Sequence, residues 1–323
     1  MTDIFKSQIV LLGATGMLGR AWRRCLSKLG TSYLAPTRLD CNLANQDSVR
    51  EYLAAHDFRA IINCAGYTGV DQAEAMQQEA LSLNATACGT LAEVCKAKRA
   101  LLVHYSTDYV FDGQSIFGYS EAAEPNPCNF YGKTKLLGEQ LIRESGCQHL
   151  IVRTSWLYSH EGTNFVRTIA EKLLRSEPLR VVDDQVGRPT HVDNLASFSC
   201  RLASQSKYGT FNISDSGLCS WYEFAVEIRR QLRCSTTITA CGSDSFKRAA
   251  SRPAFSVLDL GKITKALGKP PHWTAGTKQT IQKIVDSNAE AARFHESSRH
   301  TQTVPPPALR IAPTTILRRG KAK

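Results

Sequence analysis

Tyr131 and Lys135 are the residues in this sequence whose types and spacing could do chemistry. They lie four positions apart within Asn129-Phe-Tyr-Gly-Lys-Thr-Lys-Leu-Leu-Gly-Glu139, and in a helix this spacing places both side chains on one face, about one turn apart. An ammonium favours the phenolate and lowers the pKa of a neighbouring Tyr, so that the phenol can exchange a proton with a carbonyl or alcohol oxygen. Such pairs also occur on ordinary amphipathic helices, so the surrounding elements must decide between the two interpretations.

A glycine-rich turn near the N-terminus could hold a cofactor for this chemistry. Gly13-Ala-Thr-Gly16-Met-Leu-Gly19 follows a short aliphatic run at 8–12 and precedes an amphipathic stretch at 20–29. Strand, glycine turn and helix in this order form the dinucleotide-binding unit of parallel α/β folds. Gly13 would allow the tight turn, Gly16 the approach of a pyrophosphate, and Gly19 close packing of the helix, whose N-terminus faces the phosphates. The spacing is GxxGxxG rather than GxGxxG, and a glycine turn of another α/β protein stays an alternative.

Further apolar runs at 60–65, 101–105 and 149–153 are typical of buried parallel strands. Helical patterns separate them, including a long one at 72–98 with an expected break near residues 83–84. The sequence therefore predicts an α/β fold, a Rossmann-type doubly wound parallel sheet with a smaller C-terminal α/β substrate lobe. Thr107 follows the strand at 101–105, at the sheet edge where ligands bind, and could help Tyr131 hold a carbonyl oxygen. A helix-capping Thr is the alternative.

The residue after the second expected strand bears on the choice of cofactor. A carboxylate at this position binds the ribose 2′-hydroxyl of NAD, whereas an Arg accepts the 2′-phosphate of NADP. Arg38 follows the expected strand at 31–35, and Arg20, directly after the glycine turn, is a second cation that could help. The sequence thus favours NADPH and leaves NADH open.

We expect residues 1–155 to form the dinucleotide-binding domain, with contributions from about 180–200, and residues 156–290 to form the substrate-binding lobe. Residues 294–323 are predicted to be a basic, Pro-containing disordered tail. Within the lobe, Ser220 and Glu223 have the spacing of a capping box at the start of a helix at 220–232. Further expected elements are strands at 179–184, 209–213 and 255–258 and helices at 261–267 and from 276 to about 293.

Composition and charge exclude several classes of protein. The net charge is +11, but the segment from Arg293 to Lys323 supplies +6 of it, and no basic stripe with interleaved aromatics indicates nucleic-acid binding. No apolar run approaches the length of a membrane span, and residues 1–7 lack the pattern of a signal peptide. The eleven cysteines form no CxxC or zinc-like pattern. We expect a cytoplasmic protein with reduced thiols that binds neither a membrane nor nucleic acid.

The motifs in this order resemble the dTDP-4-dehydrorhamnose reductase family of the extended short-chain dehydrogenase/reductases. The resemblance covers about residues 7–285. Beside the glycine turn and the Tyr131 motif, the segments that carry it are His104-Tyr-Ser-Thr-Asp-Tyr-Val-Phe111, Arg153-Thr-Ser-Trp156, Asn164-Phe165 and Ala250-Ser-Arg-Pro253.

The resemblance implies that Tyr131 is the proton donor, that Lys135 binds the nicotinamide ribose and tunes the Tyr, and that Thr107 assists as a third catalytic residue. With the glycine turn, the expected cofactor-binding residues are Gly13, Thr15, Gly16, Met17, Leu18, Gly19, Arg38, Asn42, Leu43, Ala65, Gly66, Tyr67, Tyr131 and Lys135. The expected substrate-binding residues are Thr107, Asp108, Trp156, Asn164 and Arg252.

The implied reaction is reduction of the 4-keto group of dTDP-4-dehydro-L-rhamnose by NADPH or NADH, giving dTDP-L-rhamnose for polysaccharide precursors. Asn42 stands where the family usually has Asp beside the adenine. Some members bind Mg²⁺ between subunits, but Ala21 occupies one ligand position here. A metal-bridged dimer is therefore not expected, a homodimer stays open, and Asp193 is expected to be a cap or an ion-pair partner.

Two other functions remain open from the sequence. One is another nucleotide-sugar enzyme, an epimerase, a reductase or a dehydratase, although Asp108 is followed by Tyr109 rather than by the Glu typical of the dehydratases. The other is a non-catalytic NADP-binding regulatory subunit, similar to the β subunit of methionine adenosyltransferase. The intact set of Tyr131, Lys135 and Thr107 favours an enzyme.

Overall fold

The computed structural model describes the backbone of residues 4–300 and the side chains of residues 4–289. Residues up to Lys283 form one compact unit, and the chain from Ile284 onward belongs to a second. The tail predicted at 294–323 lies outside the described residues from 301 onward, whereas the last helix, α11 (Trp273–His300), continues past the predicted end near Arg293.

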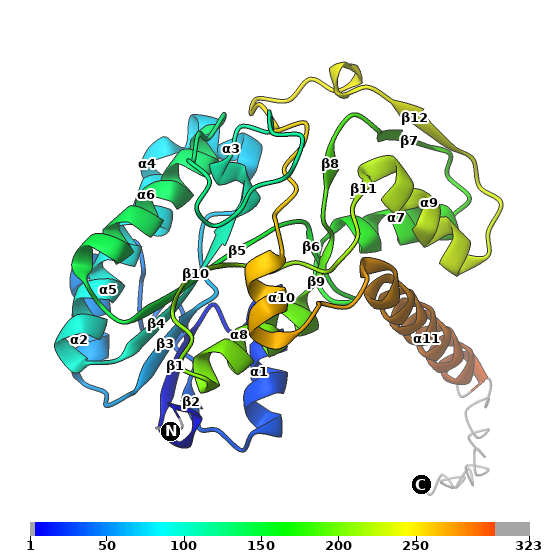
Figure 1. Ribbon diagram of the computed structural model, residues 1–323. Coiled ribbons are helices and arrows are strands. Elements are labelled where there is room, and N and C mark those ends of the chain that lie inside the picture. The colour runs from blue at the N-terminus through cyan, green and yellow to red at the C-terminus, as the bar shows by residue number, and fades with distance from the viewer. Residues whose placement is uncertain (1–3, 301–323) are drawn as a thin grey trace, which may run out of the picture. The chain divides into compact units, whose positions relative to one another are not determined.

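Within residues 4–300, the central sheet has six strands, all parallel, in the order β10-β5-β4-β3-β1-β2 (Figure 1). The strands are β1 (Ile9–Leu12), β2 (Tyr33–Leu34), β3 (Ala60–Asn63), β4 (Leu101–Thr107), β5 (His149–Thr154) and β10 (Gly209–Asn212). β1, β3 and β4 are buried along their whole length, as parallel strands covered on both faces should be. The strand order reverses between β1 and β3, which is where such sheets bind ligands. The predicted fold class is confirmed.

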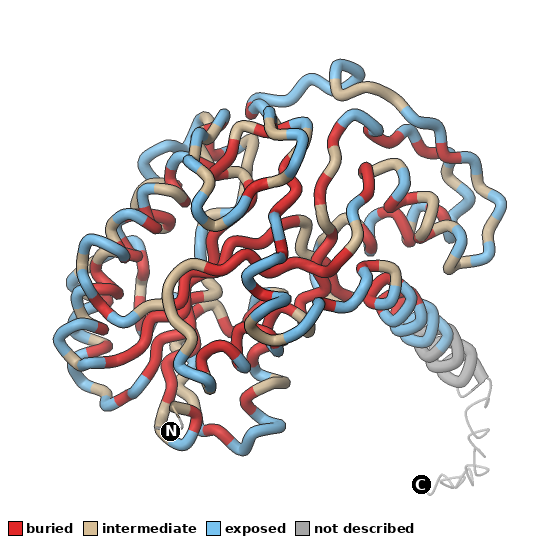
Figure 2. The backbone as a smooth tube through the Cα atoms, in the orientation of Figure 1, coloured by how far each residue is buried: buried red, intermediate tan, exposed pale blue. Residues whose placement is uncertain are grey.

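Helices cover both faces of this sheet, and the buried stretches of the chain lie on the strands and on the helix faces turned toward them (Figures 1 and 2). One face is covered by α2 (Gln46–Ala54), α5 (Ala87–Lys98) and α6 (Phe130–Ser145). The other is covered by α1 (Met17–Lys28), α8 (Val192–Ser204) and α10 (Gly261–Leu267). Trp22 of α1 is fully buried, and its indole N–H donates to the Tyr105 hydroxyl at 2.6 Å. This pairing satisfies the polar ends of two large aromatic side chains within the core.

The long helical stretch after β3 is interrupted, as the sequence predicts. It consists of α3 (Val70–Ala75), α4 (Gln77–Leu81), a π-helical turn η2 (Ser82–Thr86) and then α5. The buried Asn84 lies in this turn and binds the backbone of Tyr67 twice: its Oδ1 accepts from Tyr67 N at 2.8 Å, and its Nδ2 donates to Tyr67 O at 2.9 Å. The π turn, a feature often found at functional sites, therefore holds the segment after β3 in place.

The remaining elements of the unit ending at Lys283 form three two-stranded sheets and two further helices. The pairs are β6 (Leu157–Tyr158) with β9 (Thr190–His191), β7 (Leu179–Val182) with β12 (Ile238–Cys241), and β8 (Val186–Gly187) with β11 (Cys219–Ser220). The helices are α7 (Phe165–Leu174) and α9 (Trp221–Leu232), and short 3-10 turns are η1 (Ile4–Lys6), η3 (Asp108–Val110) and η4 (Ser243–Ser245). The capping box of Ser220 and Glu223 at α9 is confirmed.

Several elements differ from the prediction, and the short strands β6, β8, β9, β11 and β12 were not expected. Helix α8 was not expected, because its first turn follows a Gly-Arg-Pro-Thr segment that reads as a turn, but packing on α1 stabilises it. The strand expected at 255–258 is absent from the described structure, where Phe255 and Leu258 form only isolated bridges to Val186 and Tyr119. The boundary at 155/156 between two domains stays a prediction.

No disulfide links the described residues. None of the helices that the structure describes combines the length and the apolar character needed to cross a membrane.

Candidate active site

A pocket of about 810 Å³ lies where β1, β3 and β4 end, at the reversal of strand order. Turns after these strands form one wall, α6 contributes Tyr131 and Lys135, and the segments around Trp156, Glu161 and Trp221 form the opposite wall. Its size is within the range of small-molecule and cofactor sites. The topology thus brings the glycine turn and the Tyr131 helix to one cavity.

The glycine turn has the geometry that its spacing predicts. Gly13 has a φ of +70°, and a Cβ there would lie 2.8 Å from the backbone N of Ala65. A Cβ on Gly19 would lie 2.1 Å from the carbonyl oxygen of Gly13, so only glycine lets α1 pack against the turn. Gly16 caps α1 without a side-chain hydrogen bond, and the first turn carries no acidic residue. The Gly16 N–H donates to the Gly13 carbonyl oxygen at 3.0 Å, and the N–H groups of the first turn of α1 have no side-chain cap and are available to an anion in the pocket.

Most of the expected cofactor-binding residues line the pocket. They are Gly13, Thr15, Gly16, Met17, Leu18, Ala65, Gly66, Tyr67, Tyr131 and Lys135. Four do not line it. Gly19 packs the helix, Leu43 is buried in the core, Asn42 accepts a hydrogen bond from Ala44 N within its own turn, and Arg38 is exposed beyond β2. A role for these four in binding stays a prediction.

Tyr131 is half-buried in the pocket wall, and its ring meets that of Tyr109 edge-on at 6.1 Å between centroids. Burial raises the pKa of Tyr131 to about 12, a hydrogen bond with Thr107 lowers it, and the charge of Asp108 raises it. This direction is opposite to the one expected from the Tyr131/Lys135 spacing. The physical reason is that solvent exclusion outweighs any stabilisation of the phenolate.

Lys135 is buried beside Tyr131, but its nearest polar partner is a histidine. Lys135 Nζ lies 3.4 Å from Nε2 of His104, a residue of β4 that is 1% exposed. Burial lowers the pKa of Lys135, whereas the charges of Cys88 and Glu139 raise it. Burial, with the nearby charge of Lys135, also holds the pKa of His104 well below its ordinary value, so His104 is neutral at physiological pH.

Thr107 and Asp108 form a buried pair at the end of β4. The Thr107 hydroxyl donates to Asp108 Oδ1 at 3.0 Å, and Ser256, 148 residues further along, donates to Asp108 Oδ2 at 2.5 Å. Burial raises the pKa of Asp108 to about 7, although both hydroxyl bonds lower it. Thr107 also accepts from Tyr109 N at 3.2 Å and so caps the 3-10 turn η3. The Thr107 side chain therefore caps this turn and also lies next to Tyr131, so the capping interpretation does not exclude the catalytic one.

Arg252 was expected to bind substrate, but it does not line the pocket. Its guanidinium binds both carboxylate oxygens of Asp71, at 3.1 and 2.7 Å, and it also hydrogen-bonds Tyr109, which does line the pocket. The structure thus gives Arg252 a position from which it supports Tyr109.

Trp156 lines the pocket with an unusual backbone conformation, a φ of +48°. Its ring stacks on Trp221 of α9 with centroids 3.5 Å apart and planes inclined by 9°. A left-handed conformation at a bulky residue costs free energy and persists only where the surroundings enforce it. Stacking on Trp221 therefore presents a fixed aromatic wall to the cavity.

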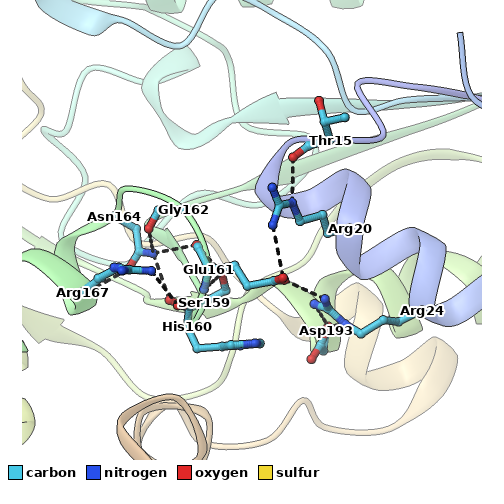
Figure 3. Close-up of polar contacts among 10 residues, drawn as sticks. All are labelled: Thr15, Arg20, Arg24, Ser159, His160, Glu161, Gly162, Asn164, Arg167 and Asp193. Carbon is cyan, nitrogen blue, oxygen red and sulfur yellow. Dashed lines mark hydrogen bonds and ion pairs between the residues drawn. The ribbon is translucent and has the colours of Figure 1, made fainter. Parts of the chain in front are cut away.

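Ion pairs join α1 to the loop Ser159–Asn164, three residues of which line the pocket (Figure 3). Glu161 of this loop accepts from Arg20 Nη1 at 3.3 Å and from Arg24 Nη1 at 2.8 Å. Arg24 Nη2 also donates to Asp193 at 2.7 Å, so the expected ion pair of Asp193 is confirmed. Although burial opposes both shifts, these bonds lower the pKa of Glu161 and raise that of Arg24.

Asn164, expected to bind substrate, does not line the pocket. Its Nδ2 donates to the carbonyl oxygens of Ser159, Glu161 and Gly162, and its Oδ1 caps α7 by accepting from Arg167 N (Figure 3). Asn164 therefore shapes the loop, and the loop residues Glu161, Gly162 and Thr163 reach the cavity instead.

Several residues at the site were not singled out from the sequence. They are His104, Asn63, Asn84, Ser256, Glu161 and Trp221. His104 begins the motif at 104–111, and Asn84 lies at the predicted helix break. The sequence could therefore have indicated these two residues. Ser256 and Glu161 have no local signal, because their partners are far away in the sequence.

The chain matches the family described as RmlD substrate binding domain over residues 7–285. A dTDP-4-dehydrorhamnose reductase of Aggregatibacter actinomycetemcomitans is 34% identical over 84% of this chain and 97% of its own. A dTDP-4-keto-6-deoxy-D-glucose reductase of Streptomyces niveus is 38% identical over 84% of this chain and 96% of its own. Among solved structures, the dTDP-4-dehydrorhamnose reductase of Bacillus anthracis in complex with NADP has a TM-score of 0.83 and 33% identity, covering 86% of this chain and 99% of that one.

Proposed function

Because the chain belongs to the RmlD substrate binding domain family and to the dTDP-4-dehydrorhamnose reductases within it, we propose that it reduces the 4-keto group of dTDP-4-dehydro-L-rhamnose to dTDP-L-rhamnose. The observation that carries this proposal is that Tyr131, Thr107 and Lys135 line the same pocket as the glycine turn. The pocket offers a proton donor next to a dinucleotide-type cradle, which is what reduction of a ketone requires.

The described residues fit a nicotinamide dinucleotide. The uncapped N-terminus of α1 suits a pyrophosphate, and Gly66 leaves space beside Lys135, because a Cβ on Gly66 would lie 3.9 Å from Nζ and 2.9 Å from Asn84 Oδ1. The NADP complex of the relative from Bacillus anthracis favours NADPH. When bound, the cofactor would supply the hydride.

Tyr131 would supply the proton to the sugar oxygen. With its pKa near 12, the phenol is protonated at neutral pH, which suits donation to an oxygen that gains negative charge. Thr107 contacts both Tyr131 and Asp108, and by turning its single O–H from Asp108 Oδ1 to the sugar oxygen it would hold that oxygen in line with the phenol. The side chains thereby orient the ketone and stabilise the developing alkoxide.

The stacked indoles of Trp156 and Trp221 would receive the deoxysugar. Aromatic faces pack against the C–H groups of a sugar, and an indole N–H can donate to a hydroxyl. Two relatives are named as reductases of different 4-keto sugars, dTDP-4-keto-6-deoxy-D-glucose and dTDP-4-dehydrorhamnose. The assay must therefore test both sugars.

The residues present do not fit the Mg²⁺ site that some relatives share between subunits. Ala21 offers no ligand, and Asp193 Oδ1 is bound by Arg24 at 2.7 Å. The proposed reaction therefore involves no metal at this position. The homodimer and the cytoplasmic location considered from the sequence stay predictions.

The test is absorbance at the reduced-nicotinamide band, with purified protein, NADPH or NADH, and the dTDP-4-keto sugar generated in situ. We expect a decay that requires both the protein and the keto sugar and is faster with NADPH. Calorimetric NADPH binding without any decay would contradict the reductase and favour a non-catalytic subunit.

A further inference from the structure

Asp108 has two hydroxyl partners, and only one of them lines the pocket. Thr107, which lines it, donates to Oδ1 at 3.0 Å, whereas Ser256, which does not, donates to Oδ2 at 2.5 Å. Asp108 and Ser256 are both 2% exposed, so water has little access to the bond between them. The carboxylate is therefore held by one hydroxyl from the pocket wall and by another from outside the pocket lining.

The bond from Thr107 to Asp108 cannot persist throughout the proposed reaction. A threonine has a single O–H, and the proposed function, on which this inference rests, turns that O–H toward the sugar oxygen. The Thr107 oxygen can still accept from Tyr109 N at 3.2 Å, so the side chain itself need not move. Asp108 Oδ1 then loses its hydroxyl donor and can accept a hydrogen bond from the substrate.

The bond from Ser256 does not depend on the substrate, because the backbone fixes Ser256. Its N–H donates to the carbonyl oxygen of Val186 at 3.0 Å, and Val186 N donates to the carbonyl oxygen of Ala254 at 2.7 Å. The two bonds form a bridge between β8 and the segment around Phe255. The Ser256 hydroxyl therefore keeps its place at Oδ2 when the Thr107 hydroxyl turns.

We propose that Ser256 is a positioning residue, which keeps the Asp108 carboxylate ionised and directs its Oδ1 atom to the sugar hydroxyl beside the keto carbon. Because Ser256 occupies Oδ2, Oδ1 is the oxygen left for the substrate. One bond from this hydroxyl to Asp108 and one from Thr107 to the keto oxygen would hold the sugar at two neighbouring positions. Two fixed positions orient the ketone toward Tyr131.

The Ser256 bond also bears on the charge of Asp108. Burial raises the pKa of Asp108 to about 7, whereas hydrogen bonds from Ser256, Thr107 and backbone N–H groups lower it. A hydroxyl that donates to a carboxylate forms a stronger bond than one that donates to a neutral acid. With the Thr107 hydroxyl turned to the substrate, Ser256 is the hydroxyl that still favours the ionised carboxylate.

The neighbouring titratable groups keep their charge state at neutral and mildly alkaline pH. Tyr131 of α6 and Tyr109 of η3 face Asp108, and burial raises the pKa of both phenols, that of Tyr131 to about 12. Arg252, which hydrogen-bonds Tyr109, stays charged. The groups that shift the pKa of Asp108 do not include Lys135 of α6. A pH-dependent signal of the Asp108 carboxyl therefore reports its own ionisation.

Three variants separate the hydroxyl of Ser256 from its packing. Ser256→Ala removes the donor to Oδ2, whereas Ser256→Thr retains a hydroxyl. Ser204→Ala on α8 is the matched control. The Ser204 hydroxyl donates to the backbone oxygen of Cys200 at 3.0 Å, and Ser204 does not line the pocket.

The first test is ¹³C NMR of the full-length protein labelled at the Asp carboxyl carbons, with the Asp108 signal assigned by its loss in Asp108→Asn. We expect a titration midpoint near pH 7 in the wild type. Ser256→Ala should raise it by about one to two pH units, the effect of a lost hydrogen bond to a charged group. Ser256→Thr and Ser204→Ala should stay near the wild type. An unchanged midpoint in Ser256→Ala would overturn the proposal, and this readout needs no substrate.

The second test is turnover of the keto sugar. For Ser256→Ala, kcat/KM should fall about five- to fiftyfold at pH 7 but at most about twofold at pH 9, where the carboxylate is ionised again. NADPH binding should not change, and Ser256→Thr should recover most of the loss. Equal losses at both pH values would mean that Ser256 acts through packing and would contradict a positioning role. A shifted midpoint without any turnover by the wild type would overturn the reductase function and, with it, the sugar contact.

Discussion

The two ends of the pocket contain similar kinds of side chain in opposite surroundings. At the Tyr131 end, Lys135 and Asp108 are 6% and 2% exposed, and burial lowers the pKa of the lysine and raises that of the carboxyl to about 7. At the loop end, the side chains of Arg20 and Glu161 are 48% and 27% exposed, and hydrogen bonds hold the pKa of Glu161 below its usual value. Solvent access, rather than residue type, separates groups that can gain or lose protons from groups that stay charged.

This difference assigns two tasks to one cavity. At the buried end, polar groups are joined by short hydrogen-bonded chains, such as Ser256 to Asp108 and Asn63 to His104. This arrangement suits proton transfer. The loop end holds fixed charges in water, which suits recognition of an anionic cofactor but adds little to stability.

The largest expected effect is that of Tyr131→Phe. Removing the phenol hydroxyl should lower kcat by about 10²-fold or more, because a general acid is lost, while NADPH binding is retained. Steady-state rates and calorimetry would measure the two quantities. Unchanged turnover would show that the buried end is not where the proton is supplied.

The second prediction compares buried and exposed ion pairs. Glu139 of α6 is 0% exposed and Arg153 of β5 is 3% exposed, with Nη2 and Oε2 2.7 Å apart. Arg153→Met leaves this carboxylate without its buried partner and should lower the free energy of unfolding by about 3–5 kcal/mol. Arg167→Met on α7 is the control, because its partner Glu171 is 42% exposed and the loss should be about 0.5 kcal/mol. Equal losses in the free energy of unfolding of the two variants, measured by urea denaturation, would contradict this comparison.

The third prediction concerns pH. The pKa of folded Asp108 is about 7, above the value of about 3.9 for an unfolded Asp, so the folded protein binds the extra proton between these values. Raising the pH through this window therefore lowers the free energy of unfolding. Asp108→Asn removes the contribution, so the stability of the variant relative to wild type should rise between about pH 4 and 7.

Two other carboxylates serve as controls for this measurement. Asp215 is also buried with a pKa of about 7, so Asp215→Asn should show the same sign. Hydrogen bonds from Thr37 lower the pKa of the exposed Asp40, so its contribution changes only below about pH 4 and Asp40→Asn should show no change relative to wild type between about pH 4 and 7. If the difference in the free energy of unfolding between Asp108→Asn and the wild type did not change with pH, the carboxyl of Asp108 would be in contact with water in the wild type.

The smallest expected effect is that of Glu161→Gln. Removing a negative charge from the pocket lining should strengthen NADPH binding by about two- to fivefold at low salt, since Arg20 and Arg24 lose a competitor for phosphate. In about 1 M salt the gain should vanish by screening. Weaker binding in calorimetry would mean that ordering of Arg20 by Glu161 matters more than charge.

The sequence by itself determined the features that depend on neighbours along the chain. Apolar runs predicted β1, β3, β4 and β5, the glycine spacing predicted the turn with Gly13 at positive φ, and Ser220 with Glu223 predicted the cap of α9. These features follow from local periodicity and backbone sterics, which act over a few residues.

Only the tertiary structure decided which groups meet and how much water they retain. Ser256 binds Asp108 across 148 residues, and Arg252 binds Asp71 across 181. The expected depression of the Tyr131 pKa was wrong for the same reason, because the four-residue spacing gives proximity to Lys135 but not the burial that outweighs it. Solvent exclusion and long-range contact arise only when distant segments pack, so no local pattern encodes them.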